Sequence, residues 1–209
     1  LLLLLFLAIG SIIFGPVDIT LKQIKDIILY NMGLSINDST FSRIHETVLL
    51  DIRLPRIMMA ILVGLGLGTA GAILQGLFRN PLVDPGFIGV SSGGAIGAMI
   101  AIMFGSFLYS YIPKILIPFT LPILAMSGSF ITTMMVYKIS KVSNKTNIMA
   151  MLLSGIAINA LSGAVIGLFI SISSDAELRS FTFWTLGGLD MSDWNVVMIT
   201  SLFVIIPFL

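Results

Sequence analysis

Four uninterrupted apolar runs constrain this chain more than any other feature of its sequence. They contain no Asp, Glu, Lys or Arg and cover residues 57–78, 86–112, 115–137 and 146–174, which is 22, 27, 23 and 29 residues. A helix needs about 20 residues to cross roughly 30 Å of hydrocarbon, so each run is long enough to span a membrane. Two shorter runs at the ends, 1–14 and 194–209, bring the expected number of spans to six.

The runs are predicted to be helices. Lipid offers no hydrogen bonds to the backbone, so a span is either a helix or a strand of a closed barrel. Barrel strands alternate apolar and polar residues over about 10 positions, whereas these runs are continuous. We therefore predict an all-α polytopic transmembrane helical bundle. Because both terminal runs look clipped, we interpret residues 1–209 as one transmembrane domain, the N-terminal part of a longer subunit.

Charge in the loops indicates the orientation. Six spans put residues 79–85 and 138–147 on one side of the membrane, with four Lys or Arg and one acidic residue. The other side carries seven Lys or Arg and nine acidic residues. Cytoplasmic loops are enriched in Lys and Arg, and Lys138, Lys141 and Lys145 are unopposed, so the first side is predicted to be cytoplasmic. The expected location is the cytoplasmic (inner) membrane.

Composition excludes several functions. A net charge of +1 argues against nucleic-acid binding, and the absence of cysteine excludes thiolate metal sites. The four complete runs carry no ionisable relay, which disfavours the alternative of an ion-coupled secondary transporter, and no sign of a membrane enzyme is visible. No G-x-x-x-x-G-K-[ST] phosphate loop occurs. We expect no catalytic residue, cofactor or resident metal, and a separate partner that supplies energy.

Small residues recur every four positions in three of the runs, in a pattern that predicts close helix packing or a path between helices. The series are Ala60, Gly64, Gly68, Ala72 and Gly76; Gly89, Gly93, Gly97, Ala101 and Gly105; and Gly155, Asn159, Gly163, Gly167 and Ser171. Asn159 lies in the middle of a run, with Ser154 and Ser162 nearby. A buried amide needs partners, so it favours a lumen or a helix contact over lipid.

The polar segment 15–56 is expected to meet the first partner outside the lipid. Thr20 is a plausible N-cap and Gly33 a stop signal for a short interfacial helix. The segment ends at Arg53-Leu54-Pro55-Arg56. On physical grounds the two arginines are either snorkelling anchors or partners for the carboxylates of a docking protein, which Arg binds in bidentate geometry.

The residues from Arg53 onward resemble a known family. The opening R-L-P-R, the A-G-x-x-x-Q-G that starts at Ala70, the N-P-L-x-D-P that starts at Asn80 and the G-V-S-S-G that starts at Gly89 are similar to the FecCD-type permease subunits of ABC importers for iron-siderophore complexes, haem and vitamin B12. The resemblance implies a ten-helix subunit that forms a homodimer. It also implies cytoplasmic ATPase subunits, contacted beyond residue 209, a periplasmic or lipid-anchored substrate-binding protein, and a metal-chelate substrate.

The resemblance also implies roles for individual residues. Arg53 and Arg56 would face the periplasm and engage acidic residues of the binding protein. Two segments would form the cytoplasmic gate: Asn80, Pro81 and Leu82, and Thr146, Asn147 and Ile148. Ser154, Asn159 and Ser162 would line the translocation path, and residues 174–189 would form a short re-entrant or interfacial helix. Independently, Pro81 and Pro85 keep the turn between them out of a helix, which suits a stiff gate element.

Overall fold

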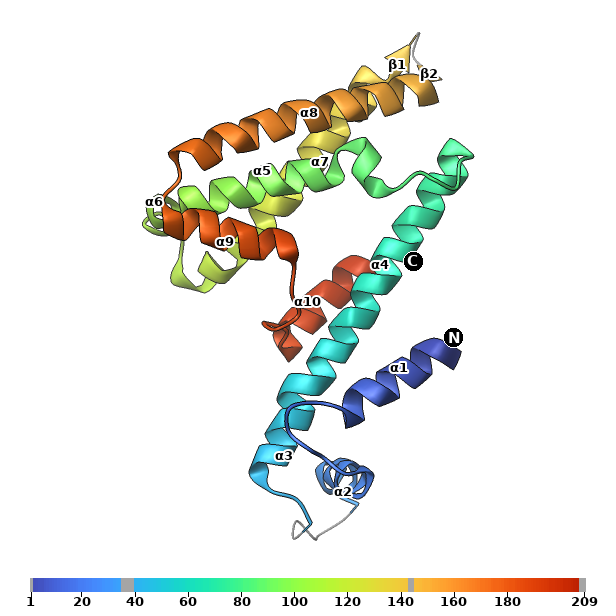
Figure 1. The fold of residues 1–209 in the computed structure, drawn as a ribbon, viewed down its shortest axis with the longest axis vertical. Helices are drawn as coiled ribbons and strands as arrows, with labels where there is room; N and C mark the ends of the chain where they lie inside the picture. The colour runs from blue at the N-terminus through green and yellow to red at the C-terminus, as the bar shows by residue number, and fades with distance from the viewer. Residues whose placement is uncertain (1, 35–39, 143–144, 207–209) are drawn as a thin grey trace. The chain divides into compact units, whose positions relative to one another are not determined.

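The computed structural model describes residues 2–34, 40–142 and 145–206, and divides the chain into two compact units (Figure 1). Unit 1 contains Leu1–Gly68 and Gly188–Leu209, and unit 2 contains Thr69–Gly187. The all-helical prediction is confirmed, apart from a small antiparallel hairpin of β1 (Lys141–Val142) and β2 (Lys145–Thr146). The single transmembrane domain stays a prediction.

Three helices of the described ranges are long and apolar enough to cross a membrane. They cover Arg43–Phe78, Lys114–Ile139 and Ile148–Ile172. Three shorter apolar helices are α1 (Leu2–Ile13), α5 (Val90–Met103) and α10 (Trp194–Ile205). Taken in chain order, these six helices correspond to the six predicted runs. Residues 1 and 207–209 of the two terminal runs lie outside the described residues.

One predicted span is not a single helix. Residues 86–112 contain the end of η2 (Pro85–Ile88), then α5 and α6 (Gly105–Tyr109). Gly89 has a φ of +83°, a left-handed conformation that a helix does not contain, so α5 begins only after it. At about 1.5 Å per residue, the 14 residues of α5 extend roughly 21 Å, which is too short to cross the hydrocarbon alone.

Unit 1 contains α1, α2 (Leu21–Asn31), α3 (Arg43–Thr47), η1 (Val48–Arg53), the first part of α4 (Leu54–Phe78) and α10. As predicted, α2 begins after Thr20, whose side chain forms a capping box with Gln23, and Gly33 follows with a φ of +71°. Figure 1 looks along α2, whereas α4 runs across the view. Two clusters form the core: Ile19, Ile24, Ile27 and Leu49, and Met59, Leu62 and Val197.

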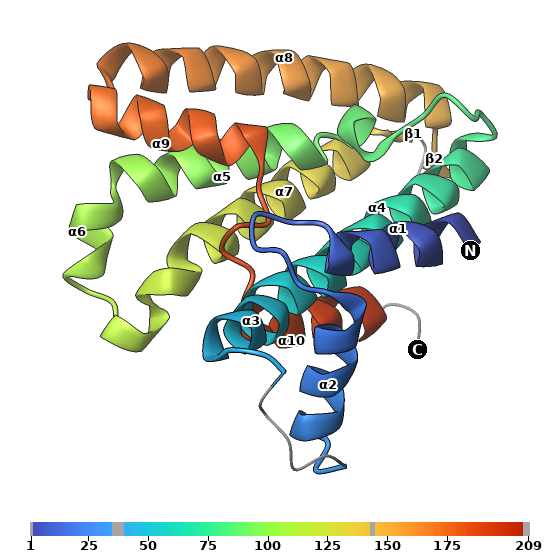
Figure 2. The same cartoon turned by 60° about the horizontal axis from the view of Figure 1, so that its bottom comes forward.

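Unit 2 contains the end of α4, η2, α5, α6, η3 (Lys114–Phe119), α7 (Thr120–Ile139), the hairpin, α8 (Ile148–Ile172) and α9 (Asp175–Leu186). α5 contacts α7, α8 and α9 (Figure 2). The core of unit 2 consists of Leu74, Phe78, Val83, Ile88, Val136, Met151 and Ile158. Because Phe78, Val136 and Met151 belong to one cluster, the loops 79–85 and 138–147 lie at the same end of the unit.

Glycine allows the close packing of α5 against α7. A Cβ on Gly97 would lie 2.0 Å from the carbonyl oxygen of Leu124, and one on Gly93 would lie 2.4 Å from that of Gly128. The predicted small-residue stripe of this run is therefore a helix contact. On α8, by contrast, a Cβ at Gly163 or Gly167 would meet nothing within 4 Å, so this part of its stripe is open.

Candidate functional site

The turn between α4 and α5 is held by its own side chains. α4 ends where Arg79 takes a positive φ of 50°, and the Asn80 Oδ1 accepts a hydrogen bond from the backbone N–H of Leu82 at 3.0 Å. Val83 is buried, whereas Leu82 is 82% exposed. The prediction that this segment is not helical is confirmed. Its role as a gate stays a prediction.

After the turn, the chain runs along α8 before α5 begins. The Asn159 Nδ2 donates to the carbonyl oxygen of Gly86 at 2.9 Å, and its Oδ1 accepts from the Ser92 hydroxyl at 2.7 Å. From α7, Thr132 donates to the carbonyl oxygen of Gly89 at 2.7 Å. Irregular backbone at membrane depth is tolerated only where protein satisfies its polar groups, and these side chains do so.

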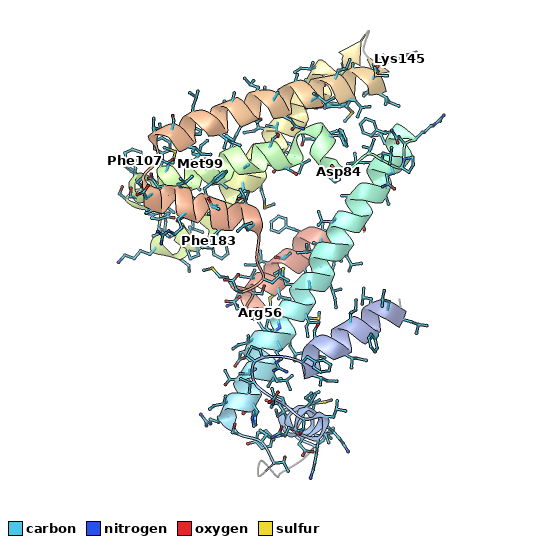
Figure 3. All side chains as sticks on the ribbon, in the orientation of Figure 1. Arg56, Asp84, Met99, Phe107, Lys145 and Phe183 are labelled. Atoms are coloured by element: carbon cyan, nitrogen blue, oxygen red, sulfur yellow. The ribbon has the colours of Figure 1, made fainter. Side chains whose placement is uncertain are left out.

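The other predicted gate segment lies at the hairpin, where Figure 3 labels Lys145. Thr146 pairs with Lys141 across the hairpin, and the Asn147 side chain caps α8 by accepting from the backbone N–H of Ala150 at 3.0 Å. The next residue, Ile148, is exposed. The two predicted gate segments therefore share one end of unit 2, and residues 143–144 between the strands lie outside the described residues.

Of the three polar residues predicted to line the path, Ser154 and Ser162 face the interior of unit 2, whereas Asn159 lines an open pocket beside Asp84, Gly86 and Ser92. Ser154 and Ser162 are 7% and 3% exposed, and Asn159 is half-buried. The Ser154 hydroxyl donates to the carbonyl oxygen of Ala150 at 2.7 Å. The sequence shows that these polar groups need partners, but not which side of α8 supplies them. In this structure Ser154 bonds to the backbone of α8 itself, whereas Asn159 bonds to Gly86 and Ser92 outside α8.

Arg53 is buried and bound within unit 1. It is 7% exposed, and its guanidinium donates to the carbonyl oxygens of Ile12 at 2.6 Å, Ile13 at 3.1 Å and Val17. Gly15 lets the chain pass this close, because a Cβ there would lie 2.5 Å from the Arg53 Nη2. Neither predicted role, snorkelling or docking, describes this arrangement, since the charge does not reach the surface.

Arg56 lies three residues further along the same helix and is exposed (Figure 3). Its Nη2 donates to the backbone carbonyl of Asp190 at 3.2 Å. Trp194 fixes the same region, because its Nε1 donates to the carbonyl oxygen of Leu50 at 3.0 Å. Sequence reasoning did not connect the segment around Asp190 with Arg56, since 134 residues separate them. Of the two predicted docking arginines, Arg56 has the accessible guanidinium.

The predicted short helix after the fifth run is present as α9. Ser174 caps it, with Glu177 completing a capping box. The backbone N–H and hydroxyl of Ser174 donate to the Glu177 carboxylate, and these bonds hold the pKa of that carboxyl below its ordinary value of 4.5.

Within the described residues, no three His, Cys, Asp or Glu side chains group closely enough to hold a metal ion.

Comparison with known proteins gives one family. The model of the FecCD transport family matches residues 2–209. The hemin transport system permease protein HmuU of Yersinia pestis is 36% identical over 203 residues, covering 96% of this chain and 55% of that protein. The molybdate import system permease protein MolB of Haemophilus influenzae is 36% identical over 209 residues, covering 100% and 57%. The chain thus spans about half the length of these relatives.

Two further matches agree. The cobalamin import system permease protein BtuC of Halobacterium salinarum is 40% identical over 146 residues, covering 70% of this chain and 37% of that protein. A solved structure, described as an inward-facing conformation of a metal-chelate type ABC transporter, matches with a TM-score of 0.72 and 30% identity, covering 94% of this chain and 54% of that one.

Proposed function

The chain belongs to the FecCD transport family, and on this premise we propose that it is part of the permease subunit of an ABC importer that moves a metal chelate across the cytoplasmic membrane. In this proposal the permease forms a homodimer and receives an iron-siderophore complex, haem or cobalamin from a substrate-binding protein. Separate cytoplasmic ATPase subunits supply the energy. The observation that carries the proposal is the family match over residues 2–209.

The surface of α8 supports a bulky and largely apolar cargo. α8 contains no charged residue, and its exposed side chains include Leu153, Ile156, Leu161 and Leu168. The open positions Gly163 and Gly167 leave room beside them. A small oxyanion such as molybdate would need charged groups or converging N–H donors, which this surface does not offer. We therefore assign the path to this face of α8 and to Asn159, which lines an open pocket, rather than to the buried Ser154 and Ser162.

The ends of the two units support the positions of the partners. We assign binding-protein docking to Arg56, whose exposed guanidinium suits acidic side chains. Arg53, by contrast, holds the backbone of residues 12–17 within unit 1. The turn Asn80–Leu82 and the segment Thr146–Ile148 share the opposite, basic loop end of the predicted topology, where we place the inner gate.

ATP-dependent uptake tests the function. The full-length permease, with its ATPase and binding protein, is reconstituted in proteoliposomes and offered haem, several ferric siderophores, cobalamin and molybdate in parallel. We expect uptake of one chelate that requires ATP. Uptake driven by an ion gradient without nucleotide would refute the ABC assignment. Uptake of molybdate alone would refute the proposal that the substrate is a metal chelate. Gly163→Leu should block uptake, whereas the control Gly10→Leu on α1, equally open, should not.

A further inference from the structure

Asn159 joins segments that are 73 residues apart in the sequence. A carbonyl oxygen can only accept a hydrogen bond, so the bond to Gly86 must come from the amide nitrogen. The amide oxygen is thereby left to accept from Ser92. One side chain of α8 thus holds both the segment before α5 and the first turn of α5.

This attachment lies well inside α8. Asn159 comes 11 residues after Ile148, the first residue of α8, which is about 17 Å along the helix. One turn earlier, a Cβ on Gly155 would lie 1.8 Å from the carbonyl oxygen of Phe87, so backbone meets backbone there. Gly86 is also held from its other side, because its N–H donates to the Asp84 Oδ1 at 2.6 Å. Gly86 is therefore bonded both to Asn159 of α8 and to Asp84, the last residue of the turn.

We propose that Asn159 is a positioning residue that fastens the turn Asn80–Asp84 to α8, so that the turn and α8 move as one body. Its place in a transport cycle rests on the proposed function. The fastening itself does not, because all of the bonds lie within unit 2. Loss of a partly buried hydrogen bond that joins two segments lets them separate in a larger share of molecules.

Distance measurements between two spin labels test the fastening directly. The labels replace Leu82 in the turn and Leu161 on α8, which are 82% and 59% exposed, in full-length protein without other cysteines. In Asn159→Leu, we expect the population outside the parent distance peak to rise about tenfold. Ser92→Ala, which removes one of the two bonds, should give a smaller rise. Ser162→Ala, on the same buried face, is the control and should match the parent.

A distance distribution that is the same in Asn159→Leu and Ser92→Ala as in the parent protein would overturn the proposal. A second readout separates positioning from simple destabilisation: the ATP hydrolysed per substrate imported should rise about tenfold in Asn159→Leu. A residue that only stabilises the fold would lower uptake and hydrolysis together and leave this ratio unchanged. If even the parent protein imports nothing, the proposed function fails while the label distances still decide the fastening.

Discussion

The guanidinium of Arg53 donates a hydrogen bond to the backbone carbonyl of Ile12 at 2.6 Å, across 41 residues of sequence. With its bonds to Ile13 and Val17, it fixes the end of α1 against the helix Arg43–Phe78. We expect Arg53→Ala to destabilise the protein by about 3 kcal/mol, because hydrogen bonds to charged groups contribute about 1.5–3 kcal/mol each and several are lost. Thermal unfolding in detergent measures this. The exposed Arg56→Ala is the matched control, and equal losses in both variants would contradict the prediction.

Arg56 is expected to affect docking rather than stability. Arg56→Glu should lower the affinity for the substrate-binding protein by about tenfold, mainly through slower association, because an exposed charge at an interface steers the encounter. Titration of the binding protein against full-length permease at several salt concentrations measures this. Lys138→Glu makes the same charge change at the predicted cytoplasmic side and should leave the affinity unchanged. An unaltered affinity and salt dependence in Arg56→Glu would refute the docking role.

Gly155 is expected to tolerate no side chain. A Cβ there would lie 1.8 Å from the carbonyl oxygen of Phe87, and the obstacle is backbone. Gly155→Ala should therefore cost about 2–3 kcal/mol of stability through overpacking. Gly163→Ala, on the same helix with nothing within 4 Å of its Cβ, should be neutral. Melting temperatures of the two variants give the comparison, and a neutral Gly155→Ala would show that α8 does not approach Phe87 this closely.

The cap of α9 should depend on pH. The pKa of the Glu177 carboxyl lies below 4.5 in the folded protein because Ser174 donates two hydrogen bonds to it. A lowered folded pKa means that the stabilisation is complete above about pH 4.5 and is lost as the pH falls through the folded value. Glu177→Gln keeps a capping-box side chain without a titrating group. Between pH 7 and pH 3, the melting temperature of this variant should fall less than that of the parent, and parallel falls would contradict the prediction.

Features that depend on neighbouring residues were predictable from the sequence. The capping box of α2 depends on Thr20 and Gln23, which are three residues apart, and its end on Gly33. The turn between Pro81 and Pro85 follows from its prolines in the same way, whereas α9 was implied by the family resemblance of residues 174–189. Six apolar helices were expected because the length of an apolar run sets whether it can span the bilayer.

Features that depend on tertiary contacts were not predictable. Arg53 and Arg56 look equivalent in the sequence, yet one is buried because residues 12–17 pack over it. The run 86–112 contains no charge, so counting charges could not reveal that Gly89 breaks the backbone before α5. Ser154, Asn159 and Ser162 were recognised as polar groups in need of partners, but the side of α8 that faces those partners is set by packing.

The route of the chain before α5 has a consequence for how the protein is made. The carbonyl groups of Gly89 and Gly86 receive hydrogen bonds from Thr132 and Asn159, which are synthesised 43 and 73 residues later. At about 5–20 residues per second, the donor for Gly86 emerges roughly 4–15 s after its acceptor. Until then the protein partners of these two carbonyl groups lie within the segment itself, in the backbone N–H groups of Gly93 and Gly89. The bonds that attach this segment to α7 and α8 therefore form only after both helices have been translated.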